Sequence, residues 1–382
     1  MVIREAIEGL GWAFSFLALG GGAYGGMAAM LTGRFLAAAA PADVAFPAVT
    51  LLKPLHGVHA GLAAALESFC ALDYPGPVQI LFGIQDAGDP AAEVVRALRA
   101  SHPERDIGLI IDPSLHGASR KASNLINLAA RARHDILVLS DADIRVEPNY
   151  LRAVAAALSA PGVGVVTCLY RGEGVGNPWS RLAAMGIDYR FLPDAICGVK
   201  FGMAWPCFGS TIALSRRTLA AIGGFEAVAD TLADDYEIGR AVRRLGLSLA
   251  IPPMTVSHLC HEASAGAFID HEIRWARTVR LIDPAGHAGS AVTHALPLAL
   301  IAGALLAFQP LVLGLIFTVF AVRIAAKLRI DAATGAGAGP WWLILPRDVL
   351  SFAVFLASFA GRSVVWQGRR FAVDRRGGLT EF

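Results

Sequence analysis

Charged residues are scarce in this chain. They make up 17% of its 382 residues, whereas hydrophobic residues make up 55%; a typical soluble domain is about a quarter charged. The shortage predicts that part of the chain lies in lipid. The formal net charge is only +2 at pH 7, which excludes the strongly basic surface of a nucleic-acid-binding protein. We therefore expect a membrane as partner and no nucleic acid.

Two common cysteine and glycine patterns are absent as well. None of the five cysteines forms a Cys-x-x-Cys pair, and their odd number and irregular spacing exclude a disulfide framework. We expect buried free thiols in a reducing compartment at Cys70, Cys168, Cys197, Cys207 and Cys260. The turn after the first predicted strand is Lys53–Gly57 rather than Gly-x-Gly-x-x-Gly, which excludes a dinucleotide-binding dehydrogenase.

Long hydrophobic runs are present at both ends. Residues 1–35 are predicted to be an N-terminal membrane anchor, because Leu10–Leu31 is uncharged and close to the roughly 20 residues that cross the hydrocarbon core. A cleaved signal peptide would have a shorter apolar core and a more basic start than Arg4 provides beside Glu5 and Glu8. We therefore favour an uncleaved anchor.

Residues 291–366 are predicted to hold the C-terminal transmembrane segments, which gives three or four segments in all. The apolar runs are Ala291–Phe308, Leu311–Val322 and Trp341–Trp366. The last run contains the neighbouring charges Arg347 and Asp348, which places its first turns at the membrane interface.

The distribution of basic residues conflicts with a simple topology. The cluster Arg323–Arg329 and the basic tail 367–382 are both predicted to be cytoplasmic by the positive-inside rule. A single crossing between them would put them on opposite sides. Either one segment is re-entrant or interfacial, or one basic cluster breaks the rule.

Residues 47–285 predict one α/β domain. Apolar strands are predicted at Ala48–Leu52, Val78–Ile84, Ile107–Ile111 and Ile136–Leu139, and helices between them at His59–Cys70, Ala91–Ala100 and Lys121–Arg131. This alternation predicts a parallel sheet with helices on both faces, whose ligands bind at the carboxyl ends of the strands. Asp86 and Asp141 lie at that edge. The nearly apolar segment Ala195–Leu214 is interpreted as part of this domain, near an acceptor entrance, and not as a membrane span.

The strongest local signal is a buried strand that runs directly into two carboxylates, Asp141 and Asp143. On a turn at a strand end, both can face one cation. Mg²⁺ and Mn²⁺ prefer oxygen ligands and take one or two carboxylates together with diphosphate oxygens. The pattern favours a divalent metal site at Asp141 and Asp143, with a capping or solvated role as the alternative.

A second acidic pair, Asp234 and Asp235, precedes the helical stretch Tyr236–Leu245. Carboxylates at this position suit the positive end of a helix dipole. Alternatively, one of them is the general base for an acceptor hydroxyl, with its pKa raised by its neighbour. The spacing does not separate these two interpretations.

A third candidate site is His271-Glu-Ile-Arg274-Trp275. Arg274 can neutralise a diphosphate and Trp275 can stack on a sugar or acceptor. The pattern by itself favours an amphipathic interfacial helix with Arg274, Arg277 and Arg280 against lipid phosphates.

Two weaker signals complete the set of candidate sites. Lys53 follows the first strand and either meets a phosphate or is an exposed lysine. The run His258–Glu262 contains possible zinc ligands, but its spacing fits no common zinc site.

Taken in order, these motifs resemble one known pattern. The motifs are Lys53-Pro-Leu-His-Gly57, Gln85-Asp86, Gly117-x-x-x-Lys121-x-x-Asn124-Leu125, Ser140-Asp141-Ala-Asp143-Ile-Arg145, Asp234-Asp235-Tyr236 and Arg274-Trp275. They resemble the ceramide glucosyltransferase family and the related bacterial glycosyltransferases associated with hopanoid biosynthesis, of the glycosyltransferase family 2/21 type. The match runs from about residue 50 to 280, and the tail Val365-Trp366-Gln-Gly368 fits it too.

The resemblance implies a GT-A fold and an inverting transfer. It implies that Asp86 lies near the uridine, that Lys121 lies along the nucleotide pocket, and that Asp141 and Asp143 bind the metal and diphosphate. Asp235 matches the catalytic base and Asp234 its acidic neighbour. Arg274 and Trp275 match the motif that closes on the diphosphate and the acceptor. Lys53 and His271 are the further expected contacts, to the nucleotide-sugar and the acceptor respectively.

The chain departs from that pattern at two places. His271 stands where the family motif usually has Gln or Arg, and Asp141-Ala-Asp143 stands where ceramide enzymes often have Asp-Ser-Gly. Both departures favour the hopanoid branch.

We therefore expect a membrane-bound enzyme that moves a hexose or N-acetylhexosamine from a UDP-sugar to a lipid hydroxyl, on a hopanoid or ceramide. Its domain is expected to face the cytoplasm at a bacterial inner membrane that the chain crosses several times. The alternatives are a processive polysaccharide synthase and a non-catalytic membrane scaffold or transporter.

Overall fold

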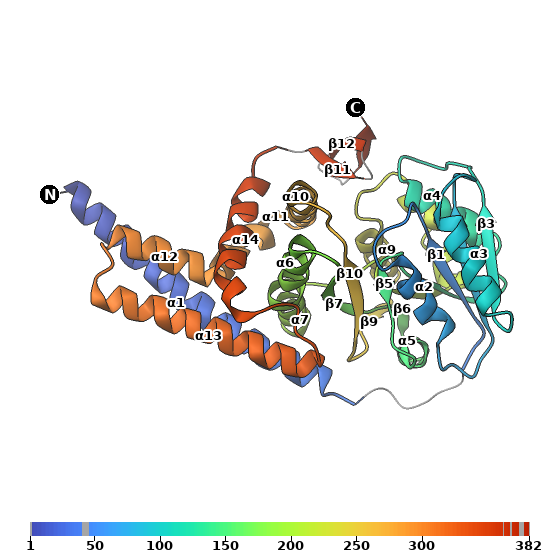
Figure 1. Cartoon of the computed structure of the whole chain (residues 1–382), viewed down its shortest axis with the longest axis horizontal. Helices are drawn as coiled ribbons and strands as arrows, with labels where there is room; N and C mark the ends of the chain where they lie inside the picture. The colour runs from blue at the N-terminus through green and yellow to red at the C-terminus, as the bar shows by residue number, and fades with distance from the viewer. Residues whose placement is uncertain (1, 40–45, 362, 367–368, 374–377, 382) are drawn as a thin grey trace.

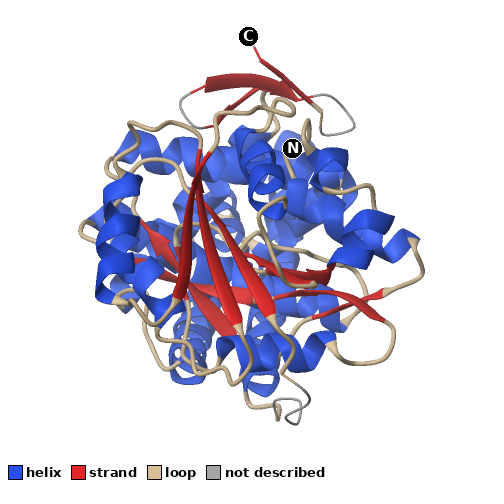
Figure 2. Cartoon of the chain, turned by 90° about the vertical axis from the view of Figure 1, so that its right-hand side faces the viewer, coloured by secondary structure: helices blue, strands red, loops and turns tan. Residues whose placement is uncertain are grey.

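A seven-stranded mixed sheet forms the centre of the domain (Figure 2). The computed structural model describes residues 2–39, 46–361, 363–366, 369–373 and 378–381. The strand order is β3-β2-β1-β4-β8-β6-β9; the first four of these run parallel and β8 runs antiparallel to both neighbours. Their bounds are β1 (Val49–Pro54), β2 (Val78–Ile84), β3 (Asp106–Ile111), β4 (Ile136–Leu139), β6 (Val163–Thr167), β8 (Ile212–Ser215) and β9 (Ser248–Ala250).

Helices cover both faces of this sheet, because alternate strand residues point to opposite sides. On β1, Val49 and Leu51 enter one buried cluster and Leu52 enters the other. The first cluster includes α2 (Leu62–Cys70), α3 (Ala91–Ser101) and α5 (Tyr150–Leu158); the second includes α4 (Arg120–Ala129), α8 (Arg216–Ala221), η2 (Phe225–Val228) and α9 (Asp234–Arg244). The predicted α/β class is confirmed, although the helix predicted from His59 begins at Leu62.

A smaller sheet stands beside the main one and was not predicted. Its order is β5-β10-β7, with bounds β5 (Ile144–Arg145), β10 (Thr255–Cys260) and β7 (Leu169–Gly174). Strand β5 directly follows the Asp141–Asp143 turn, so this sheet brings β10 against that turn.

A helical layer connects the domain to a bundle of apolar helices (Figure 1). The layer contains α6 (Pro178–Gly186), the π-helix η1 (Ile187–Phe191), α7 (Leu192–Lys200) and α10 (Ala265–Ile282). The bundle contains α1 (Val2–Leu36), α12 (Ala295–Leu305) and α13 (Pro310–Thr334), which pack on one another through Ala18, Ala299 and Val319. Between α10 and α12 lie α11 (Pro284–Gly289) and η3 (Ser290–Thr293).

Three helices are long and apolar enough to cross a membrane: Val2–Leu36, Pro310–Thr334 and Trp341–Ser358. The number rises to four if the pair Pro284–Thr293 and Ala295–Leu305, bent by 63°, counts as one broken span. These helices support a membrane protein. The last helix, formed by η4 (Trp341–Leu343) and α14 (Ile344–Ser358), ends earlier than predicted. The predicted span to Trp366 was wrong, because Ser363–Trp366 forms strand β11.

Both ends of α14 are attached to α10. Near its start, Arg347 donates a 2.8 Å hydrogen bond to the carboxylate of Glu272. Just beyond its end, Arg277 and Arg280 donate to the carbonyls of Ala360 and Gly361, at 2.5 and 2.8 Å. The side-by-side placement of the two helices is visible in Figure 1. Helix α14 therefore lies along the domain instead of leading away from it, which favours the interfacial alternative left open by the basic residues.

The C-terminal residues form more than the predicted basic tail. β11 pairs with β12 (Arg369–Val373), which pairs with β13 (Leu379–Glu381). Gly378 forms a β-bridge with Thr231, and Phe371 is buried beside Leu232. The tail is thus fastened to the segment that leads into Asp234. The arginines at positions 375 and 376 of the predicted basic tail lie outside the described residues.

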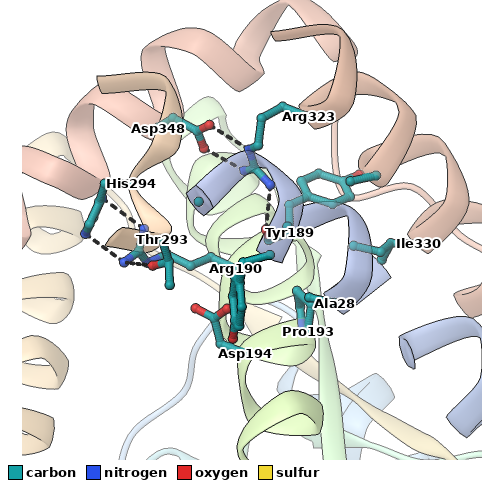
Figure 3. Close-up of a pocket in the computed structure, with 14 residues that line it drawn as sticks. Ala28, Tyr189, Arg190, Pro193, Asp194, Thr293, His294, Arg323, Ile330 and Asp348 are labelled. Carbon is teal, nitrogen blue, oxygen red and sulfur yellow. Dashed lines mark hydrogen bonds and ion pairs between the residues drawn. The ribbon is translucent and has the colours of Figure 1, made fainter. Parts of the chain in front are cut away.

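A polar junction lies where the bundle meets the helical layer (Figure 3). Arg323 of α13 forms a two-pronged ion pair with Asp348 of α14, at 2.8 and 2.7 Å, and also donates to the Tyr189 carbonyl. Arg190 of the π-helix donates to Thr293 at 3.0 Å. The cavity between them has a volume of about 30 Å³, which is enough to hold at least one water molecule. The neighbouring charges Arg347 and Asp348 therefore do not pair with each other. Arg347 pairs with Glu272 of α10, and Asp348 pairs with Arg323 of α13.

Candidate active site

Gly209 joins the two acidic pairs that the sequence singled out. Its carbonyl accepts a 3.0 Å hydrogen bond from the Asp141 amide, and its own amide donates at 2.9 Å to Oδ2 of Asp235. A Cβ at this position would lie 2.4 Å from Oδ2 of Asp141 and 2.9 Å from the Lys121 amine. Only glycine leaves the space in which these three charged groups meet.

Lys121 is the cation of this cluster. Its Nζ lies 2.7 Å from Oδ1 of Asp141 and 3.5 Å from Oδ2 of Asp234. Burial opposes the charged amine, but Asp141 and Asp234 together raise the pKa of Lys121 above its ordinary value. The residue arrives from α4, whose first turn is capped by the Ser119 side chain. A fixed positive charge therefore stands between the two acidic pairs.

Asp235 has the properties of a general base. Burial and the neighbouring Asp234 raise the pKa of Asp235 to about 6. The carboxylate is therefore ionised near neutral pH but close to the point at which it takes up a proton. Helix α9 has Ala233 at its N-cap position and no side-chain cap. Both Asp234 and Asp235 lie in the first turn of α9, so they also suit the positive end of the helix dipole.

One carboxylate oxygen of Asp143 contacts a histidine, and the other has no hydrogen-bond partner among the described residues. Oδ2 lies 3.4 Å from Nε2 of His258, whereas Oδ1 is buried without a hydrogen-bond partner among the described residues. Burial would raise the pKa of Asp143, but the His258 imidazole holds it well below the ordinary value. The result is an ionised carboxylate with a free buried oxygen beside Asp141.

Helix α10 brings the Arg-Trp motif to the same place. Burial lowers the pKa of Arg274, and the negative charges of Asp143 and Asp141 oppose that effect. Arg277 and Arg280, from the same helix, donate to the carbonyls after α14.

Several aromatic rings pack together beside the acidic cluster of Asp141 and Asp143. The Trp275 ring centroid lies 4.4 Å from that of His271, 5.8 Å from His258 and 6.5 Å from Tyr170. Nδ1 of His271 lies 2.6 Å from the buried carboxylate of Glu262, which fixes the His271 ring. His271 and Trp275 therefore lie together beside His258, the imidazole that contacts Asp143.

Two predicted site residues lie elsewhere at this edge. Asp86 is exposed at the end of β2, and its Oδ1 accepts a hydrogen bond from the Gly88 amide at 2.8 Å. Lys53 is fully buried: its amine donates to the Asp141 carbonyl at 2.5 Å and lies 3.9 Å from the Phe69 ring centroid. Lys53 therefore stabilises the backbone of the Asp141–Asp143 turn from inside the domain. Because its amine is not exposed to solvent, this position does not agree with the expected phosphate contact.

Several residues of this site were missed from the sequence. Gly209 and Tyr170 have no local signature, because their roles depend on contacts between distant segments. His258 stood in a run considered only for zinc. Among the described residues, no group of three or more His, Cys, Asp or Glu side chains is arranged to hold a metal ion.

The comparisons with known proteins agree with this fold and with one another. A family model for glycosyl transferase family 21 matches residues 13–379. Ceramide glucosyltransferase 3 of Caenorhabditis elegans is 24% identical over 241 residues, which cover 62% of this chain and 51% of that protein. Beta-monoglucosyldiacylglycerol synthase of a Synechocystis strain is 26% identical over 200 residues, covering 51% and 40%.

Among solved structures, a mannosyltransferase from Pyrobaculum calidifontis in complex with GDP-Man and Mn²⁺ superposes with a TM-score of 0.54. It is 20% identical and covers 93% of this chain and 99% of that one. The fold is of the GT-A glycosyltransferase class. The chain belongs to glycosyl transferase family 21, and it spans about half the length of the first curated relatives that it matches.

Proposed function

We propose that the chain is a membrane-bound inverting glycosyltransferase that moves a hexose or N-acetylhexosamine from a UDP-sugar to a hydroxyl of a lipid. The observation that carries the proposal is the pairing through Gly209. Through Gly209, the carboxylate of Asp235, whose pKa is about 6, lies next to the Asp141–Asp143 turn.

Each charged side chain has a separate task in this reaction. Asp235 takes the proton of the lipid hydroxyl as that oxygen attacks the anomeric carbon, and the sugar–phosphate bond breaks on the opposite face. Arg274 and Lys121 stabilise the negative charge on the departing diphosphate.

The remaining residues bind the two substrates or adjust the base. Asp86 binds the uridine at the end of β2. His271 and Trp275 contact the acceptor. Asp234 keeps the pKa of Asp235 high.

A divalent cation, Mg²⁺ or Mn²⁺, fits the Asp141–Asp143 turn. The fit rests on the unpaired buried Oδ1 of Asp143 and on the hard oxygen character of both carboxylates. Two carboxylates leave the remaining positions for diphosphate oxygens, as is usual for Mg²⁺. Such a cation supplies positive charge for the leaving diphosphate.

A lipid acceptor is supported by the names of the relatives, which include ceramide glucosyltransferases and a monoglucosyldiacylglycerol synthase. It is also supported by the apolar bundle beside the domain. We place the domain on the cytoplasmic face of a bacterial inner membrane, where nucleotide sugars are made. Ceramide, a polyhydroxylated hopanoid and diacylglycerol are the acceptors to compare.

The test is UDP release by protein purified in detergent. UDP-glucose or UDP-N-acetylglucosamine would be supplied with each lipid, with Mg²⁺, Mn²⁺ or EDTA. We expect release that depends on lipid and cation and that is lost in Asp235→Asn. Asp270→Asn is the matched control, because Asp270 is an exposed carboxylate on α10.

Other outcomes would decide against the proposal. Release without lipid, together with a growing polymer, would identify a processive polysaccharide synthase. The absence of both turnover and UDP binding with every pair would leave a membrane scaffold or transporter.

A further inference from the structure

An exposed apolar segment covers the end of α7 and the loop that follows it. In Val199–Trp205, four large side chains are turned to the surface: Val199, Phe201, Met203 and Trp205 are 37, 53, 61 and 53% exposed. Soluble surfaces scatter such residues singly, whereas a cluster marks a contact with lipid or another protein. This is the part of Ala195–Leu214 that the sequence placed near an acceptor entrance.

Four consecutive backbone amides of this segment, from Phe201 to Ala204, donate hydrogen bonds to nearby carbonyls. The amides of Met203 and Ala204 both donate to the Gly198 carbonyl, at 2.8 and 3.0 Å. The amides of Phe201 and Gly202 donate to the carbonyls of Cys197 and Val199. Gly202 has a φ of 65°, which closes this turn. A chain segment enters lipid at low cost only when its backbone groups are paired in this way.

Basic side chains border the apolar ones. Lys200 lies within this segment and is exposed, and the guanidinium of Arg243 lies 5.2 Å from the centroid of the Trp205 ring. Aromatic rings with adjacent Lys or Arg are typical of the headgroup region of a bilayer, where arginine and lysine meet lipid phosphates. The charge of the patch is complementary to an anionic lipid surface.

The loop lies next to a membrane helix. Leu192 and Ile196 of α7 pack in one cluster with Leu31 and Phe35 of α1. Figure 1 shows α7 beside the bundle. The patch therefore extends the lipid-facing part of the molecule onto the domain.

We propose that Val199–Trp205 inserts into the headgroup region of the bilayer on the same side as the domain. The loop then fixes how far the active site stands from the lipid. Trp205 precedes Gly209 by only a short stretch of chain, and Gly209 holds Asp235. Insertion of the loop therefore sets the height of the base relative to the hydroxyl of a lipid acceptor. The inference goes beyond the proposed function, because it concerns contact with lipid and not turnover.

Insertion of the loop can be tested by measuring how deep a fluorescent label at residue 203 lies in the bilayer. Met203→Cys would be labelled with a nitrobenzoxadiazole fluorophore in nanodiscs that contain phosphatidylglycerol, since all five native cysteines are buried. Two labelled controls frame the result: Leu313→Cys, exposed on the apolar part of α13, and Ser101→Cys, exposed on α3 away from the bundle.

We expect the label at residue 203 to be quenched by lipids brominated near the headgroup and to resist aqueous iodide. The label at residue 101 should show the reverse, and the label at 313 should be quenched by deeper bromines. Iodide quenching at 203 equal to that at 101 would overturn the proposal. Protection at 203 from both quenchers would also overturn it, because protein would then cover the loop.

A second measurement connects the loop to the acceptor and rests on the proposed function. The double variant Phe201→Ser, Trp205→Ser should raise KM for a bilayer-embedded acceptor severalfold and leave KM for the UDP-sugar unchanged. An unchanged acceptor KM would contradict the role in acceptor access. Because the depth measurement does not require turnover, it still tests insertion if the enzyme proposal fails.

Discussion

Gly209 is the residue on which the geometry of the site depends most. Its amide and carbonyl fix Asp235 and the Asp141 turn relative to each other, and its missing side chain leaves room for Lys121. Catalytic groups displaced by about 1 Å lose on the order of 100-fold in rate. A small change here should therefore have a large effect on activity.

We predict that Gly209→Ala lowers kcat/KM by about 100-fold, because the added Cβ pushes Asp141 and Lys121 apart. The control is Gly266→Ala on α10, where a Cβ would meet nothing nearer than 3.8 Å. The measurement is UDP release under saturating cation. Equal activity of the two variants would show that the close approach at Gly209 is not required.

The raised pKa of Asp235 predicts an acid limb in the pH profile. Below a pH of about 6 the carboxylate is protonated and cannot accept the proton of the acceptor, so kcat/KM should fall about tenfold per pH unit. Asp234→Asn removes a negative charge that raises this pKa, so the limb should move to lower pH. A limb that stays in place, or moves to higher pH, would contradict the assignment of Asp235 as the base.

At the scale of elements, helix α10 contributes both to the candidate site and to the attachment of α14. It carries Arg274 and Trp275 into the site, and it binds both ends of α14 through Glu272, Arg277 and Arg280. The attachment of α14 and the position of Arg274, which we propose as the diphosphate contact, therefore depend on the same helix.

We predict that Arg347→Ala strongly destabilises the protein. Arg347 is 4% exposed, and its loss leaves the Glu272 carboxylate without its partner. Loss of one member of a buried ion pair typically costs about 3–5 kcal/mol. The measurement is the thermal unfolding midpoint in detergent, beside Arg329→Ala on the exposed face of α13. Equal midpoints for the two variants would show that the pair contributes little.

The elements that the sequence predicted well are those with local patterns. The strands that end at Ile84 and Leu139 are short apolar runs followed by polar residues, and the parallel order follows from the alternation with helices. The error at Trp366 has a physical reason: Ser363–Trp366 is apolar, and such a short run does not distinguish a strand from the end of a helix.

The site was predicted only in part for a similar reason. The paired carboxylates stand out as local spacings, but His258, Tyr170 and Gly209 reach the site through the fold of β7, β10 and the loop before β8. Their contacts depend on sheet pairings between distant segments, which no local pattern reveals. Lys53 was misplaced because a lysine at the end of a strand does not show whether it turns up to the cleft or down into the core.

At the scale of the whole molecule, both basic clusters belong to segments that contact the domain. Arg323 contacts Tyr189 of the domain, and the C-terminal strands reach Thr231 of the same domain. We propose that α14, held along α10, lies at the membrane interface, so that no crossing separates the two clusters. This placement would remove the conflict with the positive-inside rule.

This topology predicts the labelling pattern of single cysteines. In oriented membrane vesicles, a maleimide that cannot cross the bilayer should label Arg329→Cys and Ala360→Cys from the side of the domain. It should label Val2→Cys from the opposite side, because that residue is at the far end of α1. Labelling of 329 and 360 from different sides would restore α14 as a crossing helix.

The most direct test of the central claim is the anomeric configuration of the product. The proposed mechanism is a single displacement in which Asp235 and the residues proposed to bind the diphosphate act on opposite sides of the sugar. A glycolipid formed from an α-linked UDP-sugar should therefore be β-linked, as seen in the coupling constant of its anomeric proton by NMR. An α-linked glycolipid would contradict the single displacement and the role of Asp235.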